Sequence, residues 1–219
     1  MSRLLTGCLT LSLILSVSSA DLAESTPNGR PDLSLKITVW IYNYAQVSYW
    51  TLIRAERVVT KIFRQAGIEM LWLDCTLSKA RQQPFGATIL ALKILPETMA
   101  ARHGRKLTTL GYAVASKEGG THASVFYQRV KEVAKGTVDS EPEILGHALA
   151  HEIGHLLLGS TAHDPTGIMH TDWTREDLHQ MSWQYLFFSA EQAEVLRADA
   201  LRRITLQESS PASRPASQR

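Results

Sequence analysis

Cysteine and any excess of charge are what this sequence lacks most clearly. Its 219 residues include only two cysteines, and 23 lysines and arginines against 21 aspartates and glutamates leave a net charge of +2. Two cysteines cannot build a disulfide framework or a cysteine-rich zinc module. A charge so close to neutral argues against a nucleic-acid partner, because such proteins carry a dense basic patch or stripe. With 44% apolar and 20% charged residues, the composition excludes collagen-like, coiled-coil and mostly disordered chains, so we expect one globular domain with appendages.

Long apolar runs are equally scarce, and the one near the N-terminus is short. Residues 1–20 combine the positive Arg3, an apolar stretch from Leu9 to Val17 and the small residues Ser18, Ser19 and Ala20. This order is typical of a secretory signal peptide that is cleaved after Ala20. The apolar stretch is shorter than the roughly 20 residues of a membrane span, so an uncleaved anchor is the less favoured alternative. We therefore expect a secreted or periplasmic protein with no stable membrane insertion after cleavage.

Composition also predicts where the folded part begins and ends. Residues 21–32 contain prolines, a glycine and an asparagine and are expected to form a flexible leader. Residues 206–219 are rich in serine, proline, alanine and arginine without apolar periodicity, which predicts a disordered tail. The folded domain is therefore expected over residues 33–205. Cleavage of the signal peptide would leave Cys75 as the sole cysteine, which we expect to be a buried small apolar side chain at the end of a strand.

The periodicity of apolar residues predicts an α+β fold. Strands are expected over residues 35–42, 68–73, 86–95, 111–115 and 123–127, and helices over residues 47–66, 141–158 and 190–204. Gly67 and Gly159 follow the first two helices, as expected where a chain leaves a helix in the left-handed conformation, and Ser189 is the expected N-cap of the third. The strand–helix–strand order at the start predicts a right-handed crossover between two parallel strands.

The strongest chemical signal is the sequence His151-Glu152-Ile153-Gly154-His155, an H-E-x-x-H pattern on the expected helix 141–158. Residues four apart lie on one helix face, so His151 and His155 can approach one metal ion together. Glu152 would then lie beside them, placed to take a proton from water instead of ligating the metal. Zinc is the expected ion, because it accepts imidazole ligands and leaves one tetrahedral position for water.

A pattern of five residues also occurs by chance in ordinary buried helices. The neighbours here are apolar, among them Leu149, Ile153 and Leu156, and ionisable groups in such surroundings cost several kcal/mol each if they lack partners. A metal ion removes that cost, which favours the metal-site interpretation.

The segment from His151 to Met169 resembles the metzincin clan of zinc peptidases, and within it the matrixins most closely. Their motif is H-E-x-x-H-x-x-G-x-x-H followed by a methionine turn, and Met169 lies eighteen residues after His151, as in matrixins. The chain departs from this motif at the glycine, which comes one residue late at Gly159, and at the third histidine, which comes two residues late at His163. Leu158 stands at the position of the motif's glycine, and Thr161 stands at the position of its third histidine.

The resemblance implies a Zn²⁺ site with His151, His155 and His163 as ligands, Glu152 as general base and Met169 as an apolar floor. Because the third histidine is displaced, two other ligands stay open: His170, and Glu176 in the manner of thermolysin-like enzymes (gluzincins).

The resemblance also implies a fold and a substrate. It predicts a mixed, mostly parallel sheet packed with two long helices, together with a C-terminal helix. The strand Ala123–Tyr127 is expected at the edge of this sheet, where an extended peptide would pair with it. No ligand role is expected for the other histidines: His147 is assigned to the second shell or the surface, and His103, His122 and His179 to the surface.

Three functions remain in view. The first is an exported zinc endopeptidase that hydrolyses peptide bonds with metal-activated water and Glu152 as general base. The second is a zinc-stabilised binding module without peptidase activity, which the displaced His163 motivates and the intact Glu152 opposes. The third is a gluzincin-type hydrolase that uses Glu176 as its third ligand.

Overall fold

The computed structural model describes residues 34–75, 85–101, 109–136, 141–183 and 186–209. The expected signal peptide 1–20, the leader 21–32, residues 210–219 of the expected tail and His103 lie outside these residues. Within them, no helix combines the length and the apolar character needed to cross a bilayer.

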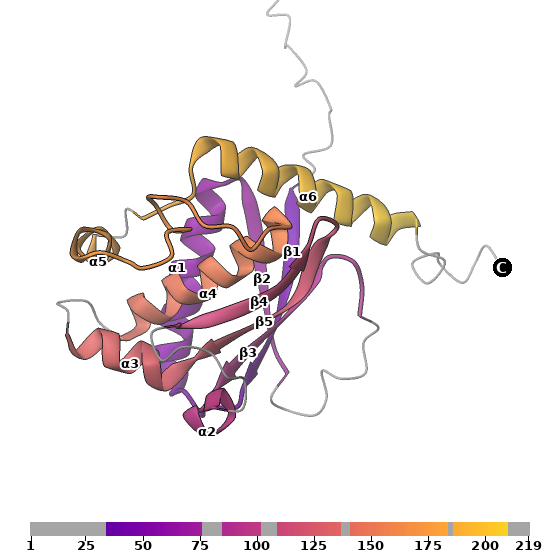
Figure 1. The fold of residues 1–219 in the computed structure, drawn as a ribbon. Coiled ribbons are helices and arrows are strands. Elements are labelled where there is room, and N and C mark those ends of the chain that lie inside the picture. Colours follow the sequence, from indigo (N-terminus) through magenta and orange to yellow (C-terminus); the bar gives the residue numbers. More distant parts are fainter. Residues whose placement is uncertain (1–33, 76–84, 102–108, 137–140, 184–185, 210–219) are drawn as a thin grey trace, which may run out of the picture. The chain divides into compact units, whose positions relative to one another are not determined.

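Five strands form one sheet, and helices pack against it, in agreement with the expected fold class (Figure 1). The strands are β1 (Leu35–Asn43), β2 (Ile68–Asp74), β3 (Ile89–Leu95), β4 (Gly111–Ser116) and β5 (Gly119–Phe126). Their order across the sheet is β2-β1-β3-β5-β4, and all neighbours are parallel except the β4–β5 pair. The helices are α1 (Tyr49–Gln65), α2 (Glu97–Ala100), α3 (Tyr127–Lys135), α4 (Glu141–Leu158), α5 (Arg175–Ser182) and α6 (Ala190–Ser209).

The first unit, β1–α1–β2, is the parallel crossover that the sequence predicts. Ile37, Val39 and Ile41 of β1 alternate into the core, where α1 buries one apolar stripe. Helix α1 ends just before Gly67, whose φ of 83° is the left-handed conformation that turns the chain into β2. Cys75 follows β2 and is fully buried, as expected.

Helix α4 is buried on nearly every side, because it packs against α1, β4, β5, α3 and α6. This environment explains its mostly apolar sequence, in which polar residues form no continuous solvent-facing side. Close approach to α1 requires Gly146: a Cβ there would lie 2.6 Å from Cβ of Val58. The helix that carries the H-E-x-x-H pattern is therefore enclosed by other elements on nearly every side.

The expectation that Ala123–Tyr127 forms the edge strand is wrong. The edge is β4, and β5 lies inside the sheet between β3 and β4. The cause is the tight β4–β5 hairpin: β5 pairs in parallel with β3, so the preceding strand is left on the outside. Tyr127 is not part of the strand either, since it begins α3.

Four helices also differ from the sequence-based expectations. The short helices α2, α3 and α5 were not anticipated, because each has too few residues for a clear apolar period. Ser189 does cap α6 as expected, with its Oγ accepting from the backbone N–H of Gln192 at 3.2 Å. Helix α6 then continues to Ser209, so residues 206–209 belong to a helix and not to the expected tail.

Arg203 fastens α6 to the rest of the domain. Its guanidinium is buried, pairs with Asp199, and donates to the carbonyl oxygens of Ala87 at 3.2 Å, Gly120 at 2.8 Å and Leu156 at 3.3 Å. Leu156 belongs to α4, and Gly120 belongs to β5, so one side chain joins three elements around the H-E-x-x-H helix.

Replacement of Arg203 should therefore be costly. We expect Arg203→Ala to lower the free energy of unfolding by about 3 to 5 kcal/mol, because three carbonyls lose a buried, charged hydrogen-bond donor and Asp199 keeps only its more exposed partner, Arg202. Urea unfolding followed by circular dichroism measures this change. Lys36→Ala, which breaks the half-exposed pair of Lys36 with Glu69, is the control and should cost less than about 1 kcal/mol. Equal losses for the two variants would contradict the anchoring role of Arg203.

Candidate metal centre

Helix α4 places His151, Glu152 and His155 in the wall of one pocket, and all three side chains are buried. Their spacing of one and four residues puts them on adjoining parts of one helix face. The two imidazole rings are nearly perpendicular, with centroids 4.7 Å apart.

Backbone carbonyls set the tautomer of both histidines. Nδ1 of His151 lies 2.7 Å from the carbonyl oxygen of Ile168, and Nδ1 of His155 lies 2.7 Å from that of Ser160. A carbonyl oxygen can only accept, so each Nδ1 carries the proton and donates it. In the neutral rings, each Nε2 is therefore left with an unprotonated lone pair.

These two lone pairs face each other, with the Nε2 atoms of His151 and His155 3.1 Å apart. Burial, reinforced by the neighbouring His155, lowers the pKa of His151 to about 3, and burial also lowers the pKa of His155. Protonation therefore does not relieve the repulsion between the lone pairs at neutral pH, whereas a metal cation between them would. Two ligands about 2.0–2.1 Å from zinc in a tetrahedral site lie roughly 3.3 Å apart, so the pair fits zinc.

His163 completes the cluster from the loop after α4. The ligand atoms of His151, His155 and His163 all lie within 4.8 Å of one another. The ring of His163 stacks on that of His151 at a centroid distance of 5.3 Å and meets the ring of His155 edge-on at 4.8 Å. His163 is exposed, unlike the two helical histidines, so the cluster is open on one side. That arrangement suits three protein ligands and one position for water or substrate.

The loop geometry shows how a histidine two residues late still reaches the cluster. Gly159 has φ of 62°, and a Cβ there would lie 2.9 Å from the carbonyl oxygen of Ser116, so the chain leaves α4 in a left-handed turn close to the β4–β5 hairpin. The next residue, Ser160, supplies the carbonyl that orients His155. Beyond His163, Asp164 N–H donates to the carbonyl of Met169 at 3.0 Å and its carboxylate accepts from Gln192 of α6. The longer loop is therefore tied at both ends.

Met169, for which the family resemblance predicts an apolar floor, packs against α4 at Gly154. It is buried, and a Cβ on Gly154 would lie 2.8 Å from its sulfur. The glycine inside the H-E-x-x-H pattern thus lets Met169 approach α4 between the two helical histidines. The preceding carbonyl, that of Ile168, accepts from His151 and also from the indole N–H of Trp173 at 3.4 Å. The turn around Met169 therefore orients a candidate ligand as well as packing against it.

Glu152 is held close to the edge strand through Gly111, a residue that sequence reasoning missed. A Cβ on Gly111 would lie 2.6 Å from Oε1 of Glu152 and 2.6 Å from the carbonyl oxygen of Ser124. Only a residue without a side chain lets the carboxylate lie against the start of β4. Nothing in the local sequence around Gly111 signals this role, because the contact joins residues forty-one positions apart.

The other candidate ligands lie apart from the cluster. Glu176 is exposed on α5, does not line the pocket and accepts a hydrogen bond from Gln180 at 3.3 Å. His170 lines the pocket, but its Nδ1 is bound to Asp177 at 2.9 Å. His147 is fully buried, which corrects the surface alternative considered for it: its Nδ1 donates to the Glu143 carbonyl at 2.8 Å, and burial lowers its pKa to about 4.

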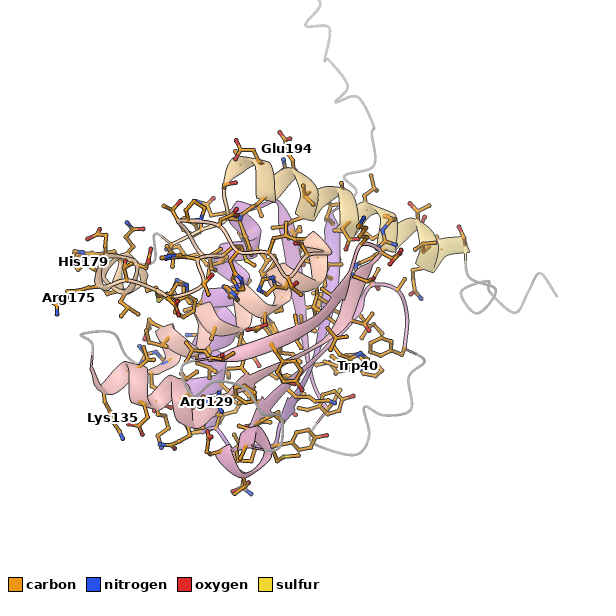
Figure 2. All side chains as sticks on the ribbon, viewed as in Figure 1. Trp40, Arg129, Lys135, Arg175, His179 and Glu194 are labelled. Carbon is orange, nitrogen blue, oxygen red and sulfur yellow. The ribbon has the colours of Figure 1, made fainter. Side chains whose placement is uncertain are left out.

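The expectation of surface positions holds for two more distant histidines. His122 of β5 and His179 of α5 are both exposed. Figure 2 labels His179 and Arg175 on α5, where both side chains point outward into solvent.

Comparisons with known proteins leave the chain without an assigned family. No protein-family model and no curated protein matches it. Among solved structures, a zinc-dependent peptidase from Methanocorpusculum labreanum is similar at 14% identity and a TM-score of 0.48, over 72% of this chain and 99% of that one. An archaemetzincin from Methanopyrus kandleri is similar at 18% identity and a TM-score of 0.42, over 81% of this chain and 99% of that one. TM1509 from Thermotoga maritima is similar at 10% identity and a TM-score of 0.32, over 82% of this chain and 100% of that one.

The third ligand can be tested by metal affinity. We expect His163→Ala to raise the dissociation constant for zinc by more than about 100-fold, because loss of a ligand exceeds the 10- to 100-fold cost of losing a group that only orients one. Competition with a chromophoric chelator measures the constant. Glu176→Ala is the matched comparison and should leave it unchanged. The opposite pattern would assign the third position to Glu176.

Proposed function

We propose that this protein is a zinc-dependent peptidase. The observation that carries the proposal is the convergence, in one open pocket, of three imidazoles whose ligand atoms lie within 4.8 Å of one another and the carboxylate of Glu152. A structural zinc site would be closed and would need no carboxylate beside it, whereas a catalytic site keeps one position open.

His151, His155 and His163 would hold the metal. Zinc bound there would supply Lewis-acid chemistry, lowering the pKa of a water molecule and polarising the scissile carbonyl. The carbonyls of Ser160 and Ile168 keep the Nε2 atoms of the helical histidines directed at the ion, so these two ligands need little reorganisation on binding.

Glu152 would act as the general base. A carboxylate oxygen of Glu152 accepts a proton from the attacking water, whose oxygen forms the new bond to the carbonyl carbon. The protonated carboxyl group of Glu152 then gives that proton to the departing amide nitrogen as the carbon–nitrogen bond breaks. The rigid burial of α4 and the contact with Gly111 hold this carboxylate in one place throughout.

The substrate we propose is a peptide or protein segment in extended conformation. The pocket has a volume of about 680 Å³, and the first residues of the edge strand, Gly111, Tyr112 and Ala113, line it. An edge strand offers backbone N–H and C=O groups to a second chain, so β4 can align a peptide beside Glu152.

Export of the protein is also part of the proposal. It rests on the signal-peptide pattern of residues 1–20 alone, which lie outside the described residues. The competing function, a zinc-stabilised binding module, has the same three histidines but assigns no role to Glu152.

The role of Glu152 separates the two functions. We expect Glu152→Gln to abolish hydrolysis of fluorescently quenched casein, because an amide cannot accept the proton. The zinc content should stay at about one ion per chain. Initial rates and elemental analysis on the same preparation measure both quantities. Full activity in the zinc-loaded variant would exclude Glu152 as the base, and an inert wild-type protein would favour the binding module.

The contact between Gly111 and Glu152 gives a second test. We expect Gly111→Ala to lower kcat by at least about tenfold with zinc content preserved, because a displacement of the carboxylate by about 1 Å can cost 100-fold in rate. Casein turnover, zinc content and the melting temperature are measured together. Gly136→Ala is the control, since a Cβ there meets nothing closer than 3.6 Å. A lower melting temperature with unchanged kcat would limit Gly111 to a role in strand pairing.

A further inference from the structure

A second polar group lies in the pocket and has no part in the metal cluster. We infer that His170, held in one tautomer by Asp177, is a substrate-binding residue that accepts a hydrogen bond from a peptide N–H or amine through its Nε2 atom. This inference rests on the proposed peptidase function and adds a specific contact to it.

Asp177 forms a rigid acceptor behind the ring. Its Oδ2 atom accepts from the backbone N–H of Thr174 at 2.8 Å, from the Thr174 hydroxyl at 2.8 Å and from Nδ1 of His170 at 2.9 Å. The backbone N–H of Asp177 in turn donates to the Thr174 hydroxyl at 3.2 Å, which completes a capping box at the start of α5. Burial raises the pKa of Asp177, but its hydrogen bonds from His170 and Thr174 outweigh this and leave the pKa below its usual value. Asp177 is therefore an ionised acceptor.

The capping box does not need His170. Thr174 and Asp177 satisfy each other in the same way at the start of many helices without a histidine nearby. The bond from His170 is an addition that joins the turn after Met169 to α5 and fixes the orientation of the imidazole ring.

The tautomer follows from this bond. An ionised carboxylate only accepts, so Nδ1 of His170 carries the proton and Nε2 of the neutral ring carries the lone pair. Nε2 makes no hydrogen bond with any described residue, and it is not among the buried unpaired polar atoms of that part of the chain. The His170 side chain is 22% exposed and lines the pocket, so Nε2 is open to a ligand there.

The polarity of the pocket agrees with a ligand that donates. Asp172 and Glu152 also line this pocket, and no lysine or arginine occurs among the described residues of its lining. Such a lining supplies acceptors for neutral or cationic groups that donate hydrogen bonds. A peptide backbone N–H and an amine both have this character.

His170 is also separate from the three clustered histidines, which share ligand atoms within 4.8 Å without it. Its contact with the substrate is therefore additional to metal binding, and loss of the contact should leave zinc in place.

Two substitutions of His170 test the roles of its Nδ1 and Nε2 atoms independently. His170→Asn keeps an N–H donor near the position of Nδ1, so the bond to Asp177 survives, but it removes Nε2. His170→Gln places a polar atom near the position of Nε2 and removes the donor to Asp177. We expect His170→Asn to keep its zinc and its melting temperature within about 2 °C, while kcat/KM for quenched casein falls about tenfold or more. His170→Gln should have the lower melting temperature of the two and the higher kcat/KM.

His179→Asn is the control, because His179 lies exposed on α5 outside the pocket lining; it should change neither quantity. Wild-type kcat/KM in His170→Asn would overturn the inference, and so would activity losses in the two variants that simply follow their melting temperatures. Failure of the proposed function looks different: the wild-type protein would then show no hydrolysis that Glu152→Gln abolishes, whatever residue 170 is.

Discussion

The structure depends on two imidazole nitrogens that face each other in the interior. Nε2 of His151 and Nε2 of His155 lie 3.1 Å apart, and their Nδ1–H groups are already committed to backbone carbonyls. Neutral rings held in this way repel, and burial opposes the charge that would relieve them. Only a cation between the two atoms turns the arrangement into an attraction. The carbonyls of Ser160 and Ile168 come from the loops after α4, so the path of those loops and the chemistry of the centre are set by the same contacts.

The burial of α4 makes this arrangement rigid. Gly146 lets the helix approach α1, and Gly154 lets Met169 and Phe188 approach it from another side. Each contact leaves no room for a Cβ, so the helix packs closely against its neighbours on two faces. Arg203 adds a polar tie from α6 to the carbonyl of Leu156, near the end of the same helix. A buried and tightly surrounded helix is a suitable carrier for ligands that must keep their orientation before the metal arrives.

Local pattern was enough to predict that His151 and His155 lie together on α4 and that β1–α1–β2 is a parallel crossover, because both features depend on residues close in sequence. The i, i+4 spacing alone puts His151 and His155 on one face, and Gly67 marks the end of α1. Features set by contacts between distant residues were not predictable in the same way. The edge strand was misplaced because strand order depends on how β5 pairs with β3, and Gly111 gave no signal because Glu152 lies far along the chain. The buried state of His147 also depends on helices that cover it, which its own neighbours do not reveal.

The displaced third histidine shows that the number of residues between two ligands predicts their distance less well than the path of the loop between them. A motif fixes the number of residues between ligands only while the loop between them keeps one conformation. Here Gly159 leaves the helix in a left-handed turn against Ser116, and the loop is closed again where Asp164 bonds Met169. Between these two fixed points, two extra residues are taken up without moving His163 away from His151. Glu176, which matches another spacing rule, lies on α5 and accepts from Gln180. The fixed points of the loop, and not the count of residues, therefore decide which side chain completes the cluster.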